Sequence, residues 1–276
     1  MSDELDLQEK AIRWLGRDEY DKFCSERADL KDVSLDEKVR LFLDTSVVTR
    51  TEFFRYPASF QYFRGYVVEE TKNRRLRVAS VGCSTGEEAY SILMSAWDVR
   101  EQLTIEAFDS NPDNIEIGKN GRYPWNKYYC GEYTVRTSLK TMGFNNTTPI
   151  YSIDHLDGMV TFTQEARSRI SFQQINILTS CPPYEYDVIL LCNVLRHLAP
   201  EGVQRVLGNV SIKLKDESLL FLGSDASIGI TNFPLLHSMG YRIVDLPDGT
   251  IFGDRIYRKS DSGFLHWHMM QQLARL

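Results

Sequence analysis

Short apolar runs alternate with helix-like segments along most of this chain. The runs 76–81, 103–108, 170–173, 186–191 and 218–222 are rich in apolar and β-branched residues, as buried parallel strands are. Segments with helical spacing lie among them, at 87–95, 112–119, 200–213 and 233–239. This order predicts an α/β fold with a doubly wound, mostly parallel sheet.

The alternation changes at the C-terminal end of the chain. Residues 242–246 and 250–257 are both strand-like, and Pro247-Asp248-Gly249 between them is a turn sequence. We therefore expect the sheet to finish with an antiparallel hairpin. A terminal helix is expected over 263–276.

Residues 122–165 interrupt the pattern. The stretch 151–162 contains Asp157-Gly158 between two β-prone runs, which is a strong hairpin signal. We interpret this region as an inserted antiparallel subdomain of two or three strands.

The first 70 residues are expected to form a small helical N-terminal domain and linker, with a second domain over 71–276. Ser34 to Glu37 has the form of a capping box, and Tyr56-Pro57 marks another helix start. Residues 1–48 carry 13 acidic and 8 basic residues, whereas 49–77 carry 7 basic and 3 acidic. The sign of the charge thus reverses just before the first strand.

Composition excludes several classes of protein. The chain has 276 residues, 42% hydrophobic and 25% charged, which is an ordinary globular balance. No apolar run is long enough to span a membrane, and the acidic start does not resemble a secretory signal. A net charge of −6 argues against a general nucleic-acid binder. Five cysteines without metal-ligand spacing are typical of free thiols in a cytoplasmic protein.

The candidate ligand site follows the first strand. Gly82, Ser84 and Gly86 form a turn of small residues that leads into a helix, so a ligand can approach the backbone and unpaired N–H groups. About 20 residues later a second strand ends in Asp109, where a carboxylate can accept hydrogen bonds from ribose hydroxyls. This combination predicts a site for a nucleotide-like ligand.

Three motifs resemble those of the chemotaxis receptor glutamate methyltransferases of the CheR type. Thr51 to Arg55 looks like the family's T-x-F-F-R, and Gly82 to Glu88 looks like its loop ending in S-T-G-E-E. Residues 186–198 are similar to its F-D-x-I-x-C-R-N-V-x-I-Y-F. The resemblance covers about residues 35–258 and includes an inserted β-subdomain.

The resemblance implies a Rossmann-like fold and the cofactor S-adenosylmethionine, with S-adenosylhomocysteine as product. It places Asp109 at the ribose, Glu87 at the polar end of the cofactor, and Asn176 and Ile177 beside the adenine. By the same resemblance, the cofactor-binding residues are Thr49, Thr51, Arg55, Gly82, Ser84, Glu87, Asp109, Asn176, Ile177, Cys192 and Asn193, and the catalytic ones are Arg55 and His197.

Transfer of an activated methyl group to a glutamate needs few catalytic groups. A glutamate is already ionised at neutral pH, so it needs alignment rather than a general base. An arginine fork can orient a carboxylate, and Arg55 is the candidate. The alternative for Arg55 is a structural salt bridge to Glu87 or Asp109.

The chain departs from the family pattern in three places. Cys192 stands where the family has arginine, and His197 where it has tyrosine. Arg196 could replace the lost charge, but a residue at that point of a strand–turn is expected to point elsewhere. The third departure is the acidic balance of residues 1–48, since the family's N-terminal domain tends to be basic.

Three functions follow from this reading. The leading hypothesis is methylation of glutamates on a helical receptor or signalling protein, with the β-subdomain as a docking strand for the receptor tail in some members of the family. The second is a module that senses the cofactor or its product without catalysis. The third is a methyltransferase for a different nucleophile, with His197 as base.

Overall fold

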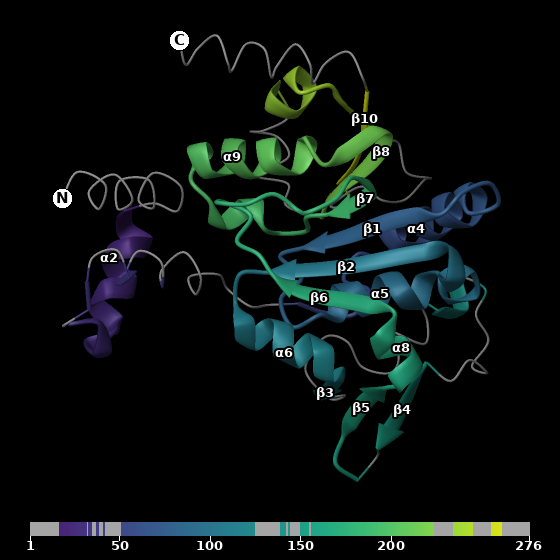
Figure 1. The fold of residues 1–276 in the computed structure, drawn as a ribbon, viewed down its shortest axis with the longest axis horizontal. Coiled ribbons are helices and arrows are strands. Elements are labelled where there is room, and N and C mark those ends of the chain that lie inside the picture. The colour runs from purple at the N-terminus through teal and green to yellow at the C-terminus, as the bar shows by residue number, and fades with distance from the viewer. Residues whose placement is uncertain are drawn as a thin grey trace.

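A computed structural model describes residues 17–31, 33–34, 37–38, 41, 51–124, 139–141, 143, 150–154, 156–223, 234–244 and 255–260. Its centre is a seven-stranded sheet in the order β6-β2-β1-β7-β8-β10-β9 (Figure 1). The pairs β1–β2, β1–β7, β2–β6 and β7–β8 are parallel, whereas β10 runs antiparallel to β8 and β9. The expected Rossmann-like fold with a final antiparallel pair is therefore confirmed.

The strands of this sheet are β1 Leu76–Val81, β2 Leu103–Asp109, β6 Ile170–Gln174, β7 Tyr186–Leu190, β8 Leu214–Gly223, β9 Tyr241–Ile243 and β10 Arg255–Lys259. The strands β1, β2, β6 and β7 match the predicted ranges to within one residue, whereas β8 begins four residues earlier than predicted and β10 ends two residues later. The predicted turn at 247–249 lies outside the described residues. All five residues of β7 are buried, as expected for a central parallel strand covered on both faces.

The structure has helices on both faces of the sheet and a further one in the N-terminal region (Figure 1). They are α2 Arg17–Glu26, α4 Pro57–Glu70, α5 Glu87–Ser95, α6 Pro112–Asn120, α8 Gln164–Ser168 and α9 Pro200–Ser211, with 3-10 turns η1 Ala28–Leu30, η2 Trp97–Gln102 and η3 Leu195–His197. One core joins α4 and α5 to Val78 and Val188, and a second joins α9 to Ala79 and Ile189. Alternate residues of β1 and β7 thus point into opposite cores.

The segment before α4 is anchored by its two phenylalanines. Phe53 and Phe54 are buried, and Phe54 has a left-handed φ of 51°. The backbone N–H of Phe54 donates to the Ser91 hydroxyl on α5 at 2.9 Å. Pro57 begins α4 as expected, and Phe60, Phe63 and Val67 form its buried face. These anchors fix the backbone on both sides of Arg55.

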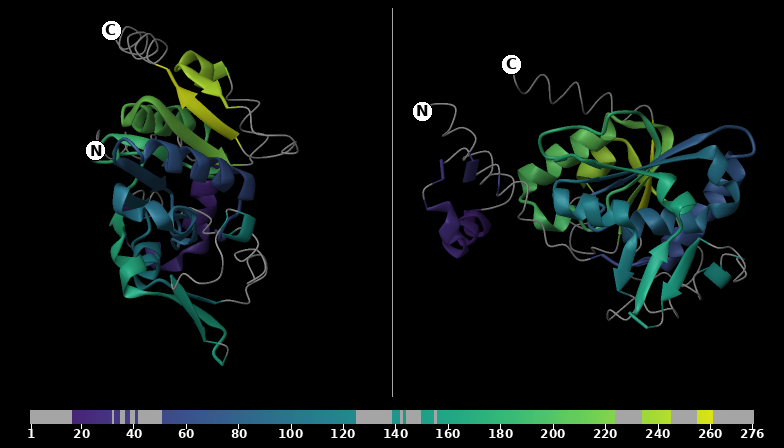
Figure 2. Two further views of the ribbon diagram at one scale, coloured as in Figure 1. Left: turned by 90° about the vertical axis from the view of Figure 1, so that its right-hand side faces the viewer. Right: turned by 60° about the horizontal axis from the view of Figure 1, so that its bottom comes forward.

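The inserted subdomain is a second sheet of three strands in the order β3-β5-β4. The strands are β3 Arg122–Pro124, β4 Tyr151–Asp154 and β5 Met159–Phe162. The Asp157-Gly158 turn joins β4 to β5 as predicted, and Gly158 has a φ of 64°. The two strands project away from the central sheet in each view (Figure 2).

Aromatic packing attaches the base of this subdomain to the main domain. The Phe162 ring stacks on Tyr90 of α5 with centroids 3.9 Å apart, and Phe53 packs edge-on against Tyr123 at 5.2 Å. Phe162 therefore serves as a core residue that holds the base of the subdomain on α5.

Within the N-terminal region, the described residues confirm helical structure over α2 and η1. The Ser34 hydroxyl accepts from the backbone N–H of Glu37 at 3.3 Å, one of the two bonds of the expected capping box. The terminal helix expected over 263–276 lies outside the described residues, and the domain boundary near residue 70 stays a prediction. Among the helices described, none is long and apolar enough to cross a bilayer.

Candidate functional site

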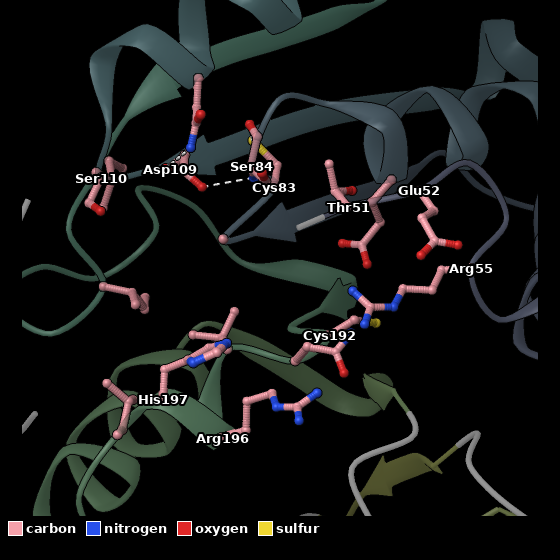
Figure 3. A pocket seen from close by; sticks show the side chains of 18 of the residues that line it. Thr51, Glu52, Arg55, Cys83, Ser84, Asp109, Ser110, Cys192, Arg196 and His197 are labelled. Carbon is pink, nitrogen blue, oxygen red and sulfur yellow. Dashed lines mark hydrogen bonds between the residues drawn. The ribbon is translucent and has the colours of Figure 1, made fainter. Parts of the chain in front are cut away.

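A cavity of about 300 Å³ lies where β1, β2, β6 and β7 end (Figure 3). Gly82 follows β1, Asp109 ends β2, Asn176 follows β6 and Cys192 follows β7, and all four line it. β1 lies between β2 and β7, so the cavity is at the point where the order of strands reverses. Open α/β sheets bind ligands at this position.

The loop after β1 brings backbone to the cavity wall. Gly82 has a φ of 71°, and a Cβ built on it would stand 2.4 Å from the Val194 side chain. The N–H groups of Gly82 and Cys83 donate to the Phe108 carbonyl at 2.7 and 2.9 Å. The Ser84 hydroxyl is buried without a hydrogen-bond partner in the described structure. A side chain at residue 82 would displace Val194, so glycine lets the turn after β1 lie against the turn after β7 in the cavity wall.

Asp109 faces the cavity and also organises the loop. Its Oδ2 accepts from the Ser84 N–H at 2.8 Å, and its Oδ1 accepts from the Asn111 N–H at 3.0 Å and from Asn114 Nδ2 at 3.1 Å. A carboxylate has about four acceptor positions, so these three donors leave about one for a ligand. Asp109 is 6% exposed.

Of the two glutamates that begin α5, Glu88 lines the cavity, whereas Glu87, which is predicted to hold the polar end of the cofactor, is not among the described wall residues. Glu87 accepts from the Thr85 hydroxyl at 2.6 Å and is not among the described residues of the wall. Glu88 lines the cavity and accepts from the Ser80 hydroxyl at 2.7 Å. Successive residues of a helix point about 100° apart, so only one of this pair can face the ligand.

The Glu88 carboxyl lies in a protected environment. Burial raises its pKa, while the hydrogen bond from Ser80, a contact with the Cys192 thiol and the Arg55 guanidinium oppose the shift. Burial also raises the pKa of the Cys83 thiol well above its usual value, and the nearby Asp109 and Glu88 carboxylates add to the shift. Cys83 therefore stays a protonated wall residue at neutral pH.

Thr51, Glu52 and Arg55 close the cavity from the segment before α4. In Figure 3 the Arg55 side chain reaches into the cavity beside Cys192, and Glu52 lies next to it. The Arg55 guanidinium also lies 5.8 Å from the centre of the Tyr56 ring. Of the other predicted residues from this segment, Thr49 lies outside the described residues.

Asn176 and Ile177, which are predicted to lie beside the adenine, line the cavity beyond β6. The Asn176 side-chain oxygen accepts from the Leu178 N–H at 3.0 Å. The Asn176 backbone carbonyl accepts from the backbone N–H groups of Thr179 and Ser180. Asn176 is thus a turn residue and a wall residue at once. Ile175 and Leu178 add apolar surface beside it.

The turn after β7 contributes Cys192, Asn193, Arg196 and His197 to the cavity wall. Asn193 takes a left-handed φ of 60°, and its N–H donates to the Leu222 carbonyl at 3.3 Å. This reversal returns η3 to the cavity, and Figure 3 shows Arg196 directed toward the side that holds Arg55. The expectation that Arg196 points elsewhere is wrong, because it assumed a simple strand-to-turn direction.

Several wall residues were missed by reasoning from the sequence. Glu52 lies inside the T-x-F-F-R match, at the position that the motif leaves open. Asn114 lies in the first turn of α6 and is identified only by its bond to Asp109. The other missed residues of the wall are Tyr56, Phe60, Cys83, Glu88, Ser110, Ile175, Leu178, Val194 and Leu198. Among the described residues, no group of histidine, cysteine and acidic side chains could hold a metal ion.

Comparison with known proteins adds a family to this geometry. The model of the family described as "CheR methyltransferase, SAM binding domain" matches residues 49–239. A protein of Rhodobacter capsulatus described as an uncharacterized 104.1 kDa protein is 29% identical over 64% of this chain and 18% of its own length. The probable biofilm formation methyltransferase WspC of Pseudomonas aeruginosa is 26% identical over 78% of this chain and 49% of its own.

A third relative matches over more of its own length. Chemotaxis protein methyltransferase 1 of Pseudomonas aeruginosa is 24% identical over 77% of this chain and 76% of its own length. The chain spans less than half the length of the first two relatives.

Proposed function

The chain belongs to the CheR methyltransferase family, and from this premise we propose that it methylates glutamate carboxylates of a receptor-type signalling protein with S-adenosylmethionine. One observation carries the proposal. Arg55, the candidate for aligning a carboxylate, lies in the same cavity as the glycine loop and Asp109. A carboxylate held there would lie next to the cofactor.

The residues of the cavity fit S-adenosylmethionine. The cofactor carries a sulfonium and an ammonium group, and the buried carboxyl of Glu88 supplies complementary charge. Gly82 keeps the loop after β1 against Val194 in the cavity wall, and the Ser84 hydroxyl, buried without a partner in the described structure, offers a polar contact. We infer that Asp109 holds a ribose hydroxyl with its remaining acceptor position, and that Asn176 and Ile177 flank the adenine.

Glu88 takes the role that the sequence assigned to Glu87. A buried carboxylate next to a ligand ammonium forms a charge-assisted hydrogen bond that is stronger than a neutral one. Its bond with Ser80 holds the carboxylate in the cavity wall, where it can accept from a ligand ammonium. Thr51 closes the wall on the side of Arg55.

Methyl transfer to a glutamate depends mainly on how the carboxylate is positioned relative to the cofactor. S-adenosylmethionine, when bound, supplies an activated methyl group. A glutamate is ionised at neutral pH, so this chain's residues need only hold it in line and keep water away. Arg55 can hold both carboxylate oxygens with its fork, and Arg196 adds a second cation to the wall. His197 can donate a hydrogen bond where the family has tyrosine.

The β-subdomain is a candidate for docking the substrate's tail. β4 pairs with β5 on one side and has an unpaired edge on the other among the described strands. Such an edge can accept an added strand, with affinity from backbone hydrogen bonds. Docking there would raise the local concentration of the glutamates near the cavity.

Two other functions keep a specific observation in their favour. Cys192 removes a cation from the family's position, which is compatible with a module that binds cofactor or product without turnover. His197 lines the cavity, so it could act as base for a hydroxyl or amine nucleophile.

The stability of the methylated product in mild base, together with the presence or absence of methyl transfer, distinguishes the three candidate functions. We expect labelled methyl groups transferred to a signalling protein to be released as methanol in mild base, as esters are. Methyl groups that resist base would favour the third function. Tight cofactor binding without transfer would favour the second.

A further inference from the structure

Tyr56 joins the two candidate catalytic segments of the cavity. Its hydroxyl donates a 2.7 Å hydrogen bond to Oδ1 of Asn193, across 137 positions of the sequence. Its ring lies 5.8 Å from the Arg55 guanidinium. The side chain is 7% exposed, and its atoms line the cavity. Tyr56 therefore contacts a group from the segment before α4 and another from the turn after β7.

The bond to Tyr56 fixes which end of the Asn193 amide meets a ligand. An asparagine amide can turn over unless a partner distinguishes its oxygen from its nitrogen. Here a hydroxyl donor occupies Oδ1, so the amide offers Nδ2 and its two N–H donors. Within the described part of the chain, no protein group accepts a hydrogen bond from Nδ2 of Asn193.

Arg55 and Asn193 together supply only donors to this side of the cavity. A guanidinium is always charged and cannot accept a hydrogen bond, and the fixed amide adds neutral N–H groups. The ligand group that matches such a wall is a carboxylate. Glu52 and Glu88 also line the cavity and would repel a bound anion. Arg196, the second cation of the wall, and the oriented Asn193 amide offset this repulsion.

We propose that Tyr56 is a positioning residue that orients the Asn193 amide and the Arg55 guanidinium to bind a carboxylate. This inference rests on the proposed function for the identity of the substrate. The carboxylate has two possible sources, the substrate glutamate and the methionine part of the cofactor. In this proposal Tyr56 acts on the carboxylate through Asn193 and Arg55, by its hydroxyl and the face of its ring.

The packing of Tyr56 provides a clean way to separate the hydroxyl from the ring. A Cβ on Gly223 would stand 2.8 Å from the Tyr56 ring, so the ring is closely packed whatever its hydroxyl does. Tyr56→Phe keeps that packing and releases the amide. Asn193→Gly removes the amide and permits the left-handed φ of 60°. Tyr62→Phe removes a tyrosine hydroxyl from α4, at a residue that is not among the described residues of the cavity wall, and serves as control.

The test measures two affinities for each variant of the full chain. Calorimetry gives the Kd of S-adenosylhomocysteine, and NMR titration of the product-saturated protein gives the Kd of N-acetyl-glutamate amide. For Tyr56→Phe we expect a loss of about tenfold in one of the two, with Tyr62→Phe within twofold of the wild type in both. Adding Tyr56→Phe to Asn193→Gly should cause little further loss.

The two affinities identify the source of the carboxylate. Loss confined to the capped glutamate assigns the subsite to substrate, and loss confined to S-adenosylhomocysteine assigns it to the cofactor. The inference is overturned if Tyr56→Phe matches the control in both, or if its effect persists undiminished in Asn193→Gly. A wild-type chain that does not bind capped glutamate contradicts the proposed substrate, and the cofactor measurement then still decides the role of Tyr56.

Discussion

The Asp109 carboxylate accepts a 2.8 Å hydrogen bond from the backbone N–H of Ser84. This bond ties the end of β2 to the turn after β1, at a residue whose φ of 50° is unfavourable for a side chain other than glycine. Asp109 therefore holds the loop in its ligand-ready shape and faces the ligand as well. Its two roles change what a substitution there will do.

Replacing Asp109 with alanine should weaken cofactor binding by roughly 1–3 kcal/mol from the unpaired hydroxyl of the ligand alone. Three protein donors also lose their acceptor, so we expect the cofactor-free protein to unfold at lower urea concentration. Calorimetry and urea titration measure the two effects. Unchanged cofactor affinity with reduced stability would leave Asp109 as a loop residue only.

Arg55→Ala should lower turnover far more than it lowers cofactor affinity. Arg55 is proposed to align the attacking carboxylate, and misalignment affects the reaction rather than the binding of the cofactor. Arg55→Lys is the matched variant, because it keeps the charge and loses the fork. A loss that appeared only in cofactor binding would place Arg55 against the methionine carboxylate.

Glu88→Gln should weaken cofactor binding more than Glu87→Gln does, because Glu88 lines the cavity and Glu87 bonds Thr85 instead. The neighbouring pair thus provides its own control, measured by calorimetry. Equal losses in the two variants would reject the assignment of Glu88 to the ligand.

The same substitution should change how stability depends on pH. Burial raises the pKa of Glu88 in the native state above its ordinary value of 4.5 in the unfolded chain. At a pH between the unfolded-state pKa and the native-state pKa, the native state therefore binds more protons than the unfolded chain. Stability then falls as pH rises through that window, and above it the native state holds a buried charge. Cofactor-free Glu88→Gln should therefore gain stability relative to wild type near neutral pH and lose this advantage below pH 4.5. Urea midpoints across pH measure it, and a constant difference would contradict it.

Docking on the β4 edge can be tested with one residue. The Thr163 N–H donates to the Ile150 carbonyl, so residue 150 is hydrogen-bonded to the strand that contains β5. Backbone N–H groups along an antiparallel strand point alternately toward the partner strand and away from it. The Ser152 N–H therefore points to β5, and the Ile153 N–H points to the open edge. Ile153→Pro should weaken substrate capture and spare cofactor affinity. Ile153→Ala loses the side chain but keeps the N–H, so it is the control. Equal KM values for the two variants would make the subdomain purely structural. Deleting residues 149–164 is a poorer test, because it also removes Phe162 from the core.

Most of the scaffold could be predicted from local pattern. β7 is a continuous buried run, and Asp157-Gly158 is a turn sequence with its own conformational preference, so both are encoded by neighbouring residues. The position of Asp109 followed from the order of strand, loop, helix and strand. These features depend on short-range rules that the tertiary structure does not override.

The sequence does not predict side-chain directions that depend on a single backbone dihedral or on a contact with a residue far along the chain. Glu87 and Glu88 differ only by the rotation of α5 at its first turn, which the sequence does not fix. Arg196 reaches the cavity because Asn193 reverses the chain, and Asn193 is held by Tyr56 from a different segment. Spacing along the sequence contains no information about such a contact.

The most direct test of the proposed activity locates the transferred methyl group. The chain is incubated with cofactor carrying a ¹³C-methyl group and with a helical signalling protein from its own source, and tandem mass spectrometry then examines the product peptides. We predict the label on glutamate side chains, with its loss in mild base and its near absence for Arg55→Ala. Label on a hydroxyl or amine, or none at all with a cofactor-saturated enzyme, would contradict methylation of glutamate.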